Sequence, residues 1–143
     1  MPSRIVTFFH NSRKVEQHSA VGTAFDKTKD HAHDLLAGNS NLGRKYGARI
    51  ESVVIRVSAI AGGATKLTFR MCLDADGDHS VVPDTEAALV TGLTTAASGC
   101  VAFSIKLPVF QVLSGETGTV YLFFKTDAGT VQVEESTVTW SET

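Results

Sequence analysis

From residue 50 onward, apolar and polar residues alternate along the chain with a period of two, which is typical of β-strands with one buried face. The alternation is clearest in RIESVVIRVSAI (49–60), TKLTFRMCL (65–73) and CVAFSIKLPVF (100–110). Its inner face extends to Ala59 in the first segment and to Leu73 in the second. The pattern predicts a core that contains Val53, Ile55, Val57, Leu67, Phe69, Met71, Val101, Phe103, Ile105, Leu122 and Phe124.

Turn signals separate the predicted strands. AGGA (61–64), SGETG (114–118) and DAG (127–129) each place glycine between apolar segments, as tight connections require. TVYLFFKT (119–126) is apolar on both faces, which predicts a central strand or a strand whose second face is covered. About eight strands with almost no helical period predict an all-β chain, an antiparallel β-sandwich of the jelly-roll type.

The first 49 residues are more polar and lack long apolar runs. Short strands are expected in RIVTFF (4–9) and SAVGTAF (19–25), and a short helix over 30–37. We therefore predict a polar N-terminal arm with loops over 1–49 and a β-sandwich domain over 50–143. Phe8 and Phe9 are the expected subunit-contact residues of the arm, because adjacent strand residues point to opposite faces. The alternative is that RIVTFF forms the first strand of the sandwich.

Composition and charge exclude several classes of function. Hydrophobic residues make up 43% of the 143 residues and charged residues 20%, which suffices for one folded domain. The net charge of −2 argues against a nucleic-acid partner, which would call for a basic excess. No apolar run is long enough to span a membrane, and MPSRIVTFFHNSRK has no signal-peptide pattern. A chain made in a cytoplasm is expected to keep Cys72 and Cys100 as free thiols.

The densest group of carboxylates lies in CLDADGDHSVVPDTE, where Asp74, Asp76 and Asp78 stand at alternate positions. These aspartates are the candidate metal ligands, and calcium is the ion that would suit them. An EF-hand loop that starts at Asp74 would need glycine at its sixth position and glutamate at its twelfth. His79 and Thr85 occupy those positions instead. We therefore predict a solvated turn rather than an obligatory calcium site, and we predict no cofactor.

Other chemical motifs are missing or incomplete. His31 and His33 in DHAHD are two residues apart, a spacing that suits a shared metal ion only in an extended segment. No third ligand follows at a matching spacing, so a zinc site is not predicted. The chain has neither a Gly-x-Ser-x-Gly motif nor a phosphate-binding loop. An enzyme is therefore not expected.

A resemblance to a known class of proteins indicates a function. The segments LDADGDHSVVPDTEAALVTGLTTAASGCVAFSIKLP and VYLFFKTDAGTVQVEESTVTWSE resemble small β-sandwich virion proteins of tailed bacteriophages. The shared features are Asp-Gly turns, Thr- and Ala-rich loops, a KTDAG hairpin and a Trp near the end, within residues 50–143. The resemblance implies a non-enzymatic protein that binds and stabilises a phage capsid as a decoration, cement or minor capsid protein. It also implies assembly in the host cytoplasm, a location in the virion, homo-oligomers, and the major capsid protein or another virion protein as partner.

Two other functions stay open at this stage. A carbohydrate-binding β-sandwich module or a tail-fibre-type adhesion protein needs exposed aromatic residues, for which Tyr46, Tyr121 and Trp140 are candidates. An enzyme on a cupin-like scaffold needs histidines and carboxylates clustered on its barrel strands. Four of the five histidines precede residue 50, which makes the enzyme the weaker alternative.

Overall fold

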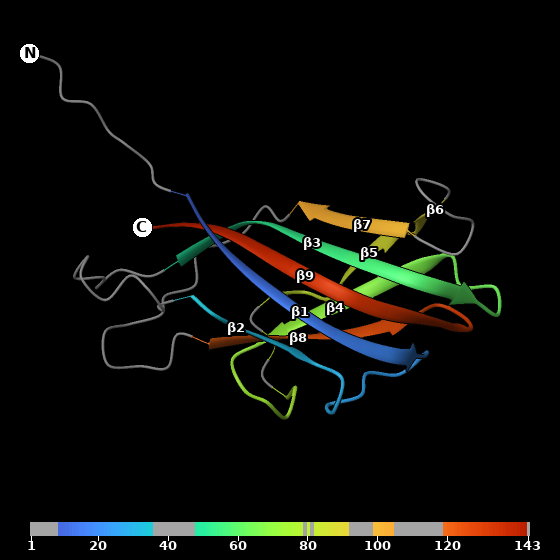
Figure 1. Cartoon of the computed structure of the whole chain (residues 1–143). Helices are drawn as coiled ribbons and strands as arrows, with labels where there is room; N and C mark the ends of the chain where they lie inside the picture. The colour runs from blue at the N-terminus through green and yellow to red at the C-terminus, as the bar shows by residue number, and fades with distance from the viewer. Residues whose placement is uncertain are drawn as a thin grey trace, which may run out of the picture.

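The chain folds into two antiparallel β-sheets that face each other (Figure 1). The computed structural model describes residues 9–35, 48–78, 80, 82–91, 99–104 and 119–142. Its strands are β1 (Phe9–Val21), β2 (His31–Asp34), β3 (Ala48–Ala61), β4 (Lys66–Cys72), β5 (Thr85–Ala88), β6 (Val90–Thr91), β7 (Gly99–Ser104), β8 (Thr119–Thr126) and β9 (Thr130–Glu142). The described part of the chain contains no helix of the length and hydrophobicity that a membrane span requires.

The strand order is that of a jelly roll. One sheet has the order β1-β9-β3-β7-β6, and the other has the order β2-β8-β4-β5. The first strand pairs with the last, β2 pairs with β8, β3 pairs with β7, and β4 pairs with β5. A long antiparallel hairpin that rolls up into two layers produces this pattern, and β6 only extends one edge by two residues. The predicted all-β sandwich of the jelly-roll type is confirmed.

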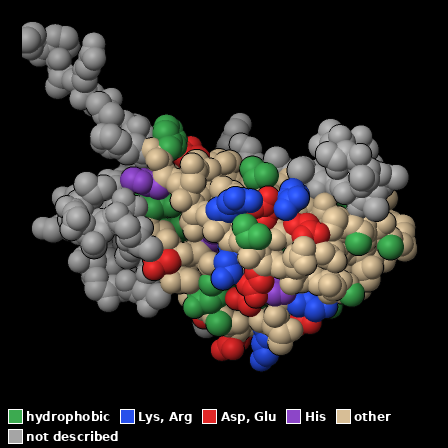
Figure 2. Space-filling model, in the orientation of Figure 1, with side chains coloured by type: hydrophobic (Ala, Val, Ile, Leu, Met, Phe, Trp, Pro, Cys, Tyr) green, Lys and Arg blue, Asp and Glu red, His purple; other side chains and the backbone are tan. Residues whose placement is uncertain are grey.

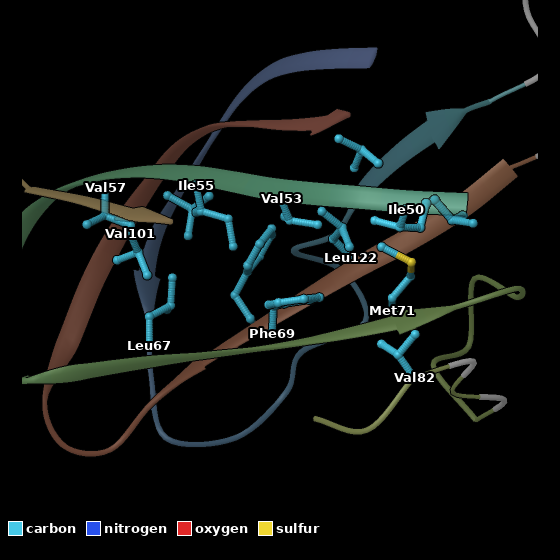
Figure 3. Close-up of a cluster of buried hydrophobic side chains, with 14 of the residues drawn as sticks. Ile50, Val53, Ile55, Val57, Leu67, Phe69, Met71, Val82, Val101 and Leu122 are labelled. Carbon is cyan, nitrogen blue, oxygen red and sulfur yellow. The ribbon is translucent and has the colours of Figure 1, made fainter. Parts of the chain in front are cut away.

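The core lies between the two sheets, where the inner faces of β3 and β4 meet (Figure 3). Nine of the predicted core residues are at most 2% exposed: Val53, Ile55, Val57, Leu67, Phe69, Met71, Val101, Leu122 and Phe124. The side chains of Phe103 and Ile105 lie outside the described residues. β9 adds Val133, Val138 and Trp140 to the core. The period-two pattern therefore identified the inner face correctly wherever the strands are regular.

The alternation fails at two predicted inner positions. Ala59 is exposed, because β3 shifts register against β9 between Ser58 and Ala61, and Ala59 itself has a φ of 49°. A bulge of this kind inserts an unpaired residue and turns the following side chain to the other face. Leu73 is 47% exposed because β4 ends at Cys72 and the chain turns away from the sheet.

The prediction that the sandwich begins at residue 50 is wrong for residues 9–34. β1 pairs with β9 from Phe9 to Val21, and β2 pairs with β8 from His31 to Asp34. The helix expected over 30–37 is likewise replaced over its described part by β2 and a bend at Leu35. Both strands were missed because their inner faces carry histidine, serine and lysine in place of aliphatic residues. Residues 1–8, which include Phe8, lie outside the described residues, and an arm there stays a prediction.

On the outer face of the second sheet, Phe123 is covered by a turn of the same chain. Phe123 of β8 points away from the core but is 1% exposed. Gly77 lies directly over its ring, since a β-carbon at Gly77 would come within 3.4 Å of it. Cys72 on the neighbouring strand is a buried free thiol, and burial raises its pKa. The apolar second face of β8 was correctly read as that of a central strand, and its cover belongs to the same chain.

Candidate functional site

The acidic turn is organised by its first aspartate. Asp74 Oδ1 accepts the backbone N–H groups of Gly77 at 3.0 Å and of Asp78 at 3.2 Å. Gly77 has a φ of 76°, a conformation that glycine adopts without steric cost. Asp74 therefore holds a local turn of the kind that aspartate and glycine commonly make. Among the described residues, no three His, Cys, Asp or Glu side chains are grouped so that they could hold a metal ion.

Asp76 and Asp78 line a cavity of about 670 Å³ between the acidic turn and the loop that follows β1. The other residues of its wall are Ala20, Gly22, Thr23, Ala24, Phe25, Asp26, Lys27, Lys29, Arg70, Gly77 and Phe123. Positive and negative side chains are equally represented, so the cavity does not select a ligand by charge. The guanidinium of Arg70 in this wall is already engaged, because it donates two hydrogen bonds of 2.9 Å to Asp84.

The Phe25 ring in the wall of this cavity is engaged as well. The Arg70 guanidinium lies 4.3 Å from the centre of the Phe25 ring, and the Lys125 ammonium lies 4.9 Å from it. The hydrogen bonds from Arg70 lower the pKa of Asp84, which keeps the ion pair charged. These contacts hold the loop that contains Phe25 against the second sheet. The cavity therefore follows from the way this loop packs.

A different surface carries three exposed apolar side chains. The outward side chains of β1, β9 and β3 form what we call the outer face, defined by Phe9, Arg13, Val15, Val54, Arg56 and Glu135. Phe9 is 60% exposed, Val15 is 61% exposed and Val54 is 41% exposed. Figure 2 shows hydrophobic side chains set among basic and acidic ones on this side of the molecule. These apolar side chains are separated by polar and charged ones rather than gathered in one continuous apolar patch.

Cross-strand ion pairs connect the three strands of the outer face. Glu135 of β9 accepts a hydrogen bond from Arg13 of β1 at 2.5 Å and another from Arg56 of β3 at 2.8 Å. Its neighbour Glu134 accepts hydrogen bonds from Gln17 and Gln132, and a short one from Ser58.

The hydrogen bonds lower the pKa of both glutamates. The register of β9 shifts at this point against both neighbours, so that two consecutive glutamates reach donors on β1 and β3. Three strands are thereby joined at a point where β9 shifts register.

The structure places the predicted subunit-contact residue Phe9 on this face. Phe9 is the first residue of β1, and its exposure agrees with a role in contact, which stays a prediction. Sequence reasoning missed Val15 and Val54 as surface residues. Val15 was hidden in a segment read as loops, although its alternation with Arg13 places it on the same face. Val54 is the middle residue of the apolar run VVI, and since Val53 and Ile55 point inward, the alternation places Val54 on the outward face.

Comparison with known proteins gives distant similarities. No family model matches the chain, and no curated protein is similar to it in sequence. The native virion of Kashmir bee virus at acidic pH contains a chain with 15% identity and a TM-score of 0.38, covering 93% of this chain and 71% of that one. The virus-like particle of the Macrobrachium rosenbergii extra small virus gives 14% identity and a TM-score of 0.35, covering 98% and 85%. The jelly-roll assignment rests on the strand order of this chain alone.

Proposed function

We propose that this chain is a non-enzymatic structural protein of a virion, which binds and stabilises a phage capsid as a decoration, cement or minor capsid protein. The observation that carries the proposal is the outer face, where Phe9 and Val15 of β1 and Val54 of β3 are exposed and ion pairs join β1 and β3 to β9. A rigid sheet that presents separated apolar side chains can dock on a second protein with little loss of conformational entropy. The resemblance of residues 50–143 to virion proteins of tailed bacteriophages supports the same proposal.

The partners follow from this surface. The major capsid protein or another virion protein would meet the outer face, and further copies of the chain would meet it or residues 1–8. The exposed apolar side chains supply contact area, while Arg13 and Arg56 remain partly exposed beside them and can pair with acidic groups of a partner. The location in the virion belongs to this proposal.

A carbohydrate-binding module is supported less well. Such a module stacks sugars on exposed aromatic rings, and Trp140 is 2% exposed. Phe25 is covered by two cations. Tyr46 lies outside the described residues. The exposed aromatic ring among the described residues of the outer face is Phe9, and the next outward residues are the polar Asn11 of β1 and Thr139 of β9.

The first test is whether the protein is a component of purified virus particles, measured by mass spectrometry of banded particles. The second measures binding of the purified protein to capsids that lack it, by co-sedimentation. Replacing Phe9 and Val15 by serine should reduce binding at least tenfold while leaving the melting temperature nearly unchanged, because both side chains are mostly exposed. Val90→Ser is the matched control, since Val90 is 49% exposed at the opposite edge of the same sheet.

Two outcomes would count against the proposal. One is capsid binding by the Phe9 and Val15 double variant that equals that of the unaltered protein. The other is absence from particles together with specific binding on a glycan array, which would favour the carbohydrate-binding alternative.

A further inference from the structure

Two histidines are buried side by side between the sheets. His31 and His33 of β2 are 0% and 1% exposed, and both point toward the other sheet. Their rings meet at Ser136 of β9, whose hydroxyl oxygen lies 2.7 Å from His31 Nδ1 and 2.7 Å from His33 Nε2. Ser136 is itself 0% exposed. On the far sides, Glu16 O lies 2.8 Å from His31 Nε2, and Ser12 Oγ lies 2.9 Å from His33 Nδ1.

Donor and acceptor counting assigns every proton in this chain of groups. The Glu16 carbonyl can only accept, so His31 carries its proton on Nε2 and its Nδ1 accepts from the Ser136 hydroxyl. The single hydrogen of Ser136 is then used, so Ser136 accepts from His33 Nε2. His33 Nδ1 in turn accepts from the Ser12 hydroxyl. All hydrogen bonds are satisfied with both imidazoles neutral.

A second proton on both rings would disrupt this arrangement. Each imidazolium would direct an N–H group at the Ser136 oxygen, and the serine hydrogen would lose its acceptor. Two positive charges would also face each other across one buried oxygen atom. Burial, with a smaller contribution from the neighbouring His31, lowers the pKa of His33 to about 4, although a backbone hydrogen bond with Ser12 acts in the opposite direction. Burial is likewise the main cause of the lowered pKa of His31.

The surrounding charges do not compensate the pair. β1 contributes His18, whose ring centre lies 5.3 Å from that of His31, and the exposed side chains of Lys14 and Glu16. His18 and Lys14 disfavour a charge on His31, while Glu16 favours one but is half exposed and shared with Lys14. From β8, Phe124 packs edge-on against His31 at 5.2 Å and does not titrate. β9 contributes Ser136, which does not titrate either.

The histidines tie a weakly attached strand to the opposite sheet. β2 has four residues, lies at the edge of its sheet and pairs with β8 alone. The hydrogen bonds of His31 and His33 to Ser12, Glu16 and Ser136 link it to β1 and β9 of the other sheet. An edge strand of this length has few ladder hydrogen bonds, so its retention depends on what its inner side chains contact.

We propose that the His31–Ser136–His33 chain is an acid-sensitive lock, which holds β2 against β1 and β9 at neutral pH and releases it on acidification. In the open state the two imidazoles can bind protons, and in the closed state they stay neutral. Lowering the pH below the ordinary pKa of imidazole therefore shifts the equilibrium toward the open state. The remaining strands stay paired, because neither His31 nor His33 belongs to the core between β3 and β4. The lock is a property of the fold and holds whether or not the chain works in a virion.

Native-state hydrogen exchange, corrected for the intrinsic pH dependence of amide exchange, tests the lock. Between pH 7 and pH 5, the opening constant of amides in 31–34 should rise by about 25-fold if one histidine stays neutral in the closed state. It should rise by about 600-fold if both do. At each pH, amides of β4 should open at least tenfold less often than those of β2, since they need global unfolding. Equal opening constants for β2 and β4, or a β2 opening constant independent of pH, would overturn the proposal.

Variants separate the titration from the packing. His31→Gln combined with His33→Gln keeps amide donors toward Glu16 and Ser136 but cannot be protonated, so the rise between pH 7 and pH 5 should disappear. His10→Gln is the control, because His10 stacks on Trp140 and lies outside the lock. An undiminished pH dependence in the double variant contradicts the proposal. If the double variant fails to fold, His33→Gln alone should still reduce the rise in the opening constant, and an unchanged rise there also contradicts the proposal.

Discussion

At the residue scale, two aspartates stabilise turns by accepting backbone hydrogen bonds. Asp74 accepts from Gly77 and Asp78 within one turn. Asp127 reaches a different turn, where its Oδ1 accepts the N–H groups of Thr65 at 2.9 Å and Lys66 at 3.0 Å. Exposed carboxylates contribute little to stability through their charge alone. An ordered turn, however, needs hydrogen-bond acceptors for its backbone N–H groups. These aspartates are therefore structural groups.

The acidic turn should be independent of calcium. Excess EDTA is expected to leave the melting temperature nearly unchanged. Asp74→Ala should lower the free energy of unfolding by about 1–2 kcal/mol, because two backbone donors lose a charged acceptor. Asp76→Ala is the control and should change it by less than about 0.5 kcal/mol. Chemical unfolding measures both variants, and a large fall in melting temperature with EDTA that calcium reverses would show a metal site instead.

Asp127 should make stability depend on pH in the acid range. Its hydrogen bonds with Thr65 and Lys66 hold its pKa far below the ordinary value. The unfolded chain therefore takes up this proton at a higher pH, and the contribution is complete above about pH 4 and declines as the pH falls below it. Asp127→Asn should be less stable than the unaltered protein at pH 7 and approach it at pH 2. A stability difference that is constant from pH 7 to pH 2 would exclude this role.

At the element scale, two turns that connect the two sheets at one end of the sandwich depend on each other. The turn after β3 contains Gly62, and the turn before β9 contains Gly129. Their backbones touch, since a β-carbon on Gly129 would lie 2.0 Å from the carbonyl oxygen of Ala61 and 2.6 Å from the carbonyl carbon of Gly62. Pairing of Ala61 with Thr130 continues the same contact into the sheet. Glycine is required here by close approach as well as by backbone conformation.

Substitution at Gly129 should therefore be far more damaging than substitution at Gly63. Gly129→Ala is expected to cost roughly 3 kcal/mol or more, because the backbones of both turns must move apart. Gly63→Ala also places alanine at a positive φ, but nothing lies within 4 Å of its β-carbon, so about 1 kcal/mol is expected. Urea unfolding of the two variants measures the difference. Equal losses would mean that conformation, rather than contact between the turns, governs both sites.

At the scale of the whole molecule, the N-terminal strands complete the roll. β1 covers the edge of β9 along 13 residues, and β2 covers the edge of β8. Val21 and Leu35 contribute buried apolar side chains from this half, and both are at most 2% exposed. Lys14 points inward from the exposed edge of β1, a device that discourages pairing with further strands. The sandwich therefore needs sequence that a boundary at residue 50 would leave out.

Two deletions should separate the sandwich from any arm. Removal of residues 1–49 is expected to abolish cooperative unfolding, because it uncovers β9 and β8 and opens the core. Removal of residues 1–8 takes away none of the described strands, so the protein should fold with a nearly unchanged melting temperature. The fluorescence of Trp140, the single tryptophan, and circular dichroism report both outcomes.

If residues 1–8 form a contact arm, the shorter deletion should still reduce capsid binding or oligomerisation. A folded protein that lacks residues 1–49 and keeps its β-sheet signal would contradict this assignment of the N-terminal strands.

The sequence by itself determined the all-β class, the strands from β3 onward and the identity of the inner face, because local alternation reflects burial of one face of a regular strand. It also identified the Gly-containing turns at 61–64 and 127–129, since glycine is needed there locally. Only the tertiary structure decided that residues 9–34 belong to the sheets. In the sequence, Ser12 fell between predicted strands, and His31 and His33 fell in the short helix predicted over 30–37. The two histidines become interior residues only because Ser136, more than a hundred residues after each of them, satisfies their hydrogen bonds. Polar groups enter a core when partners meet them there, and those partners are set by the fold, not by neighbours in the sequence.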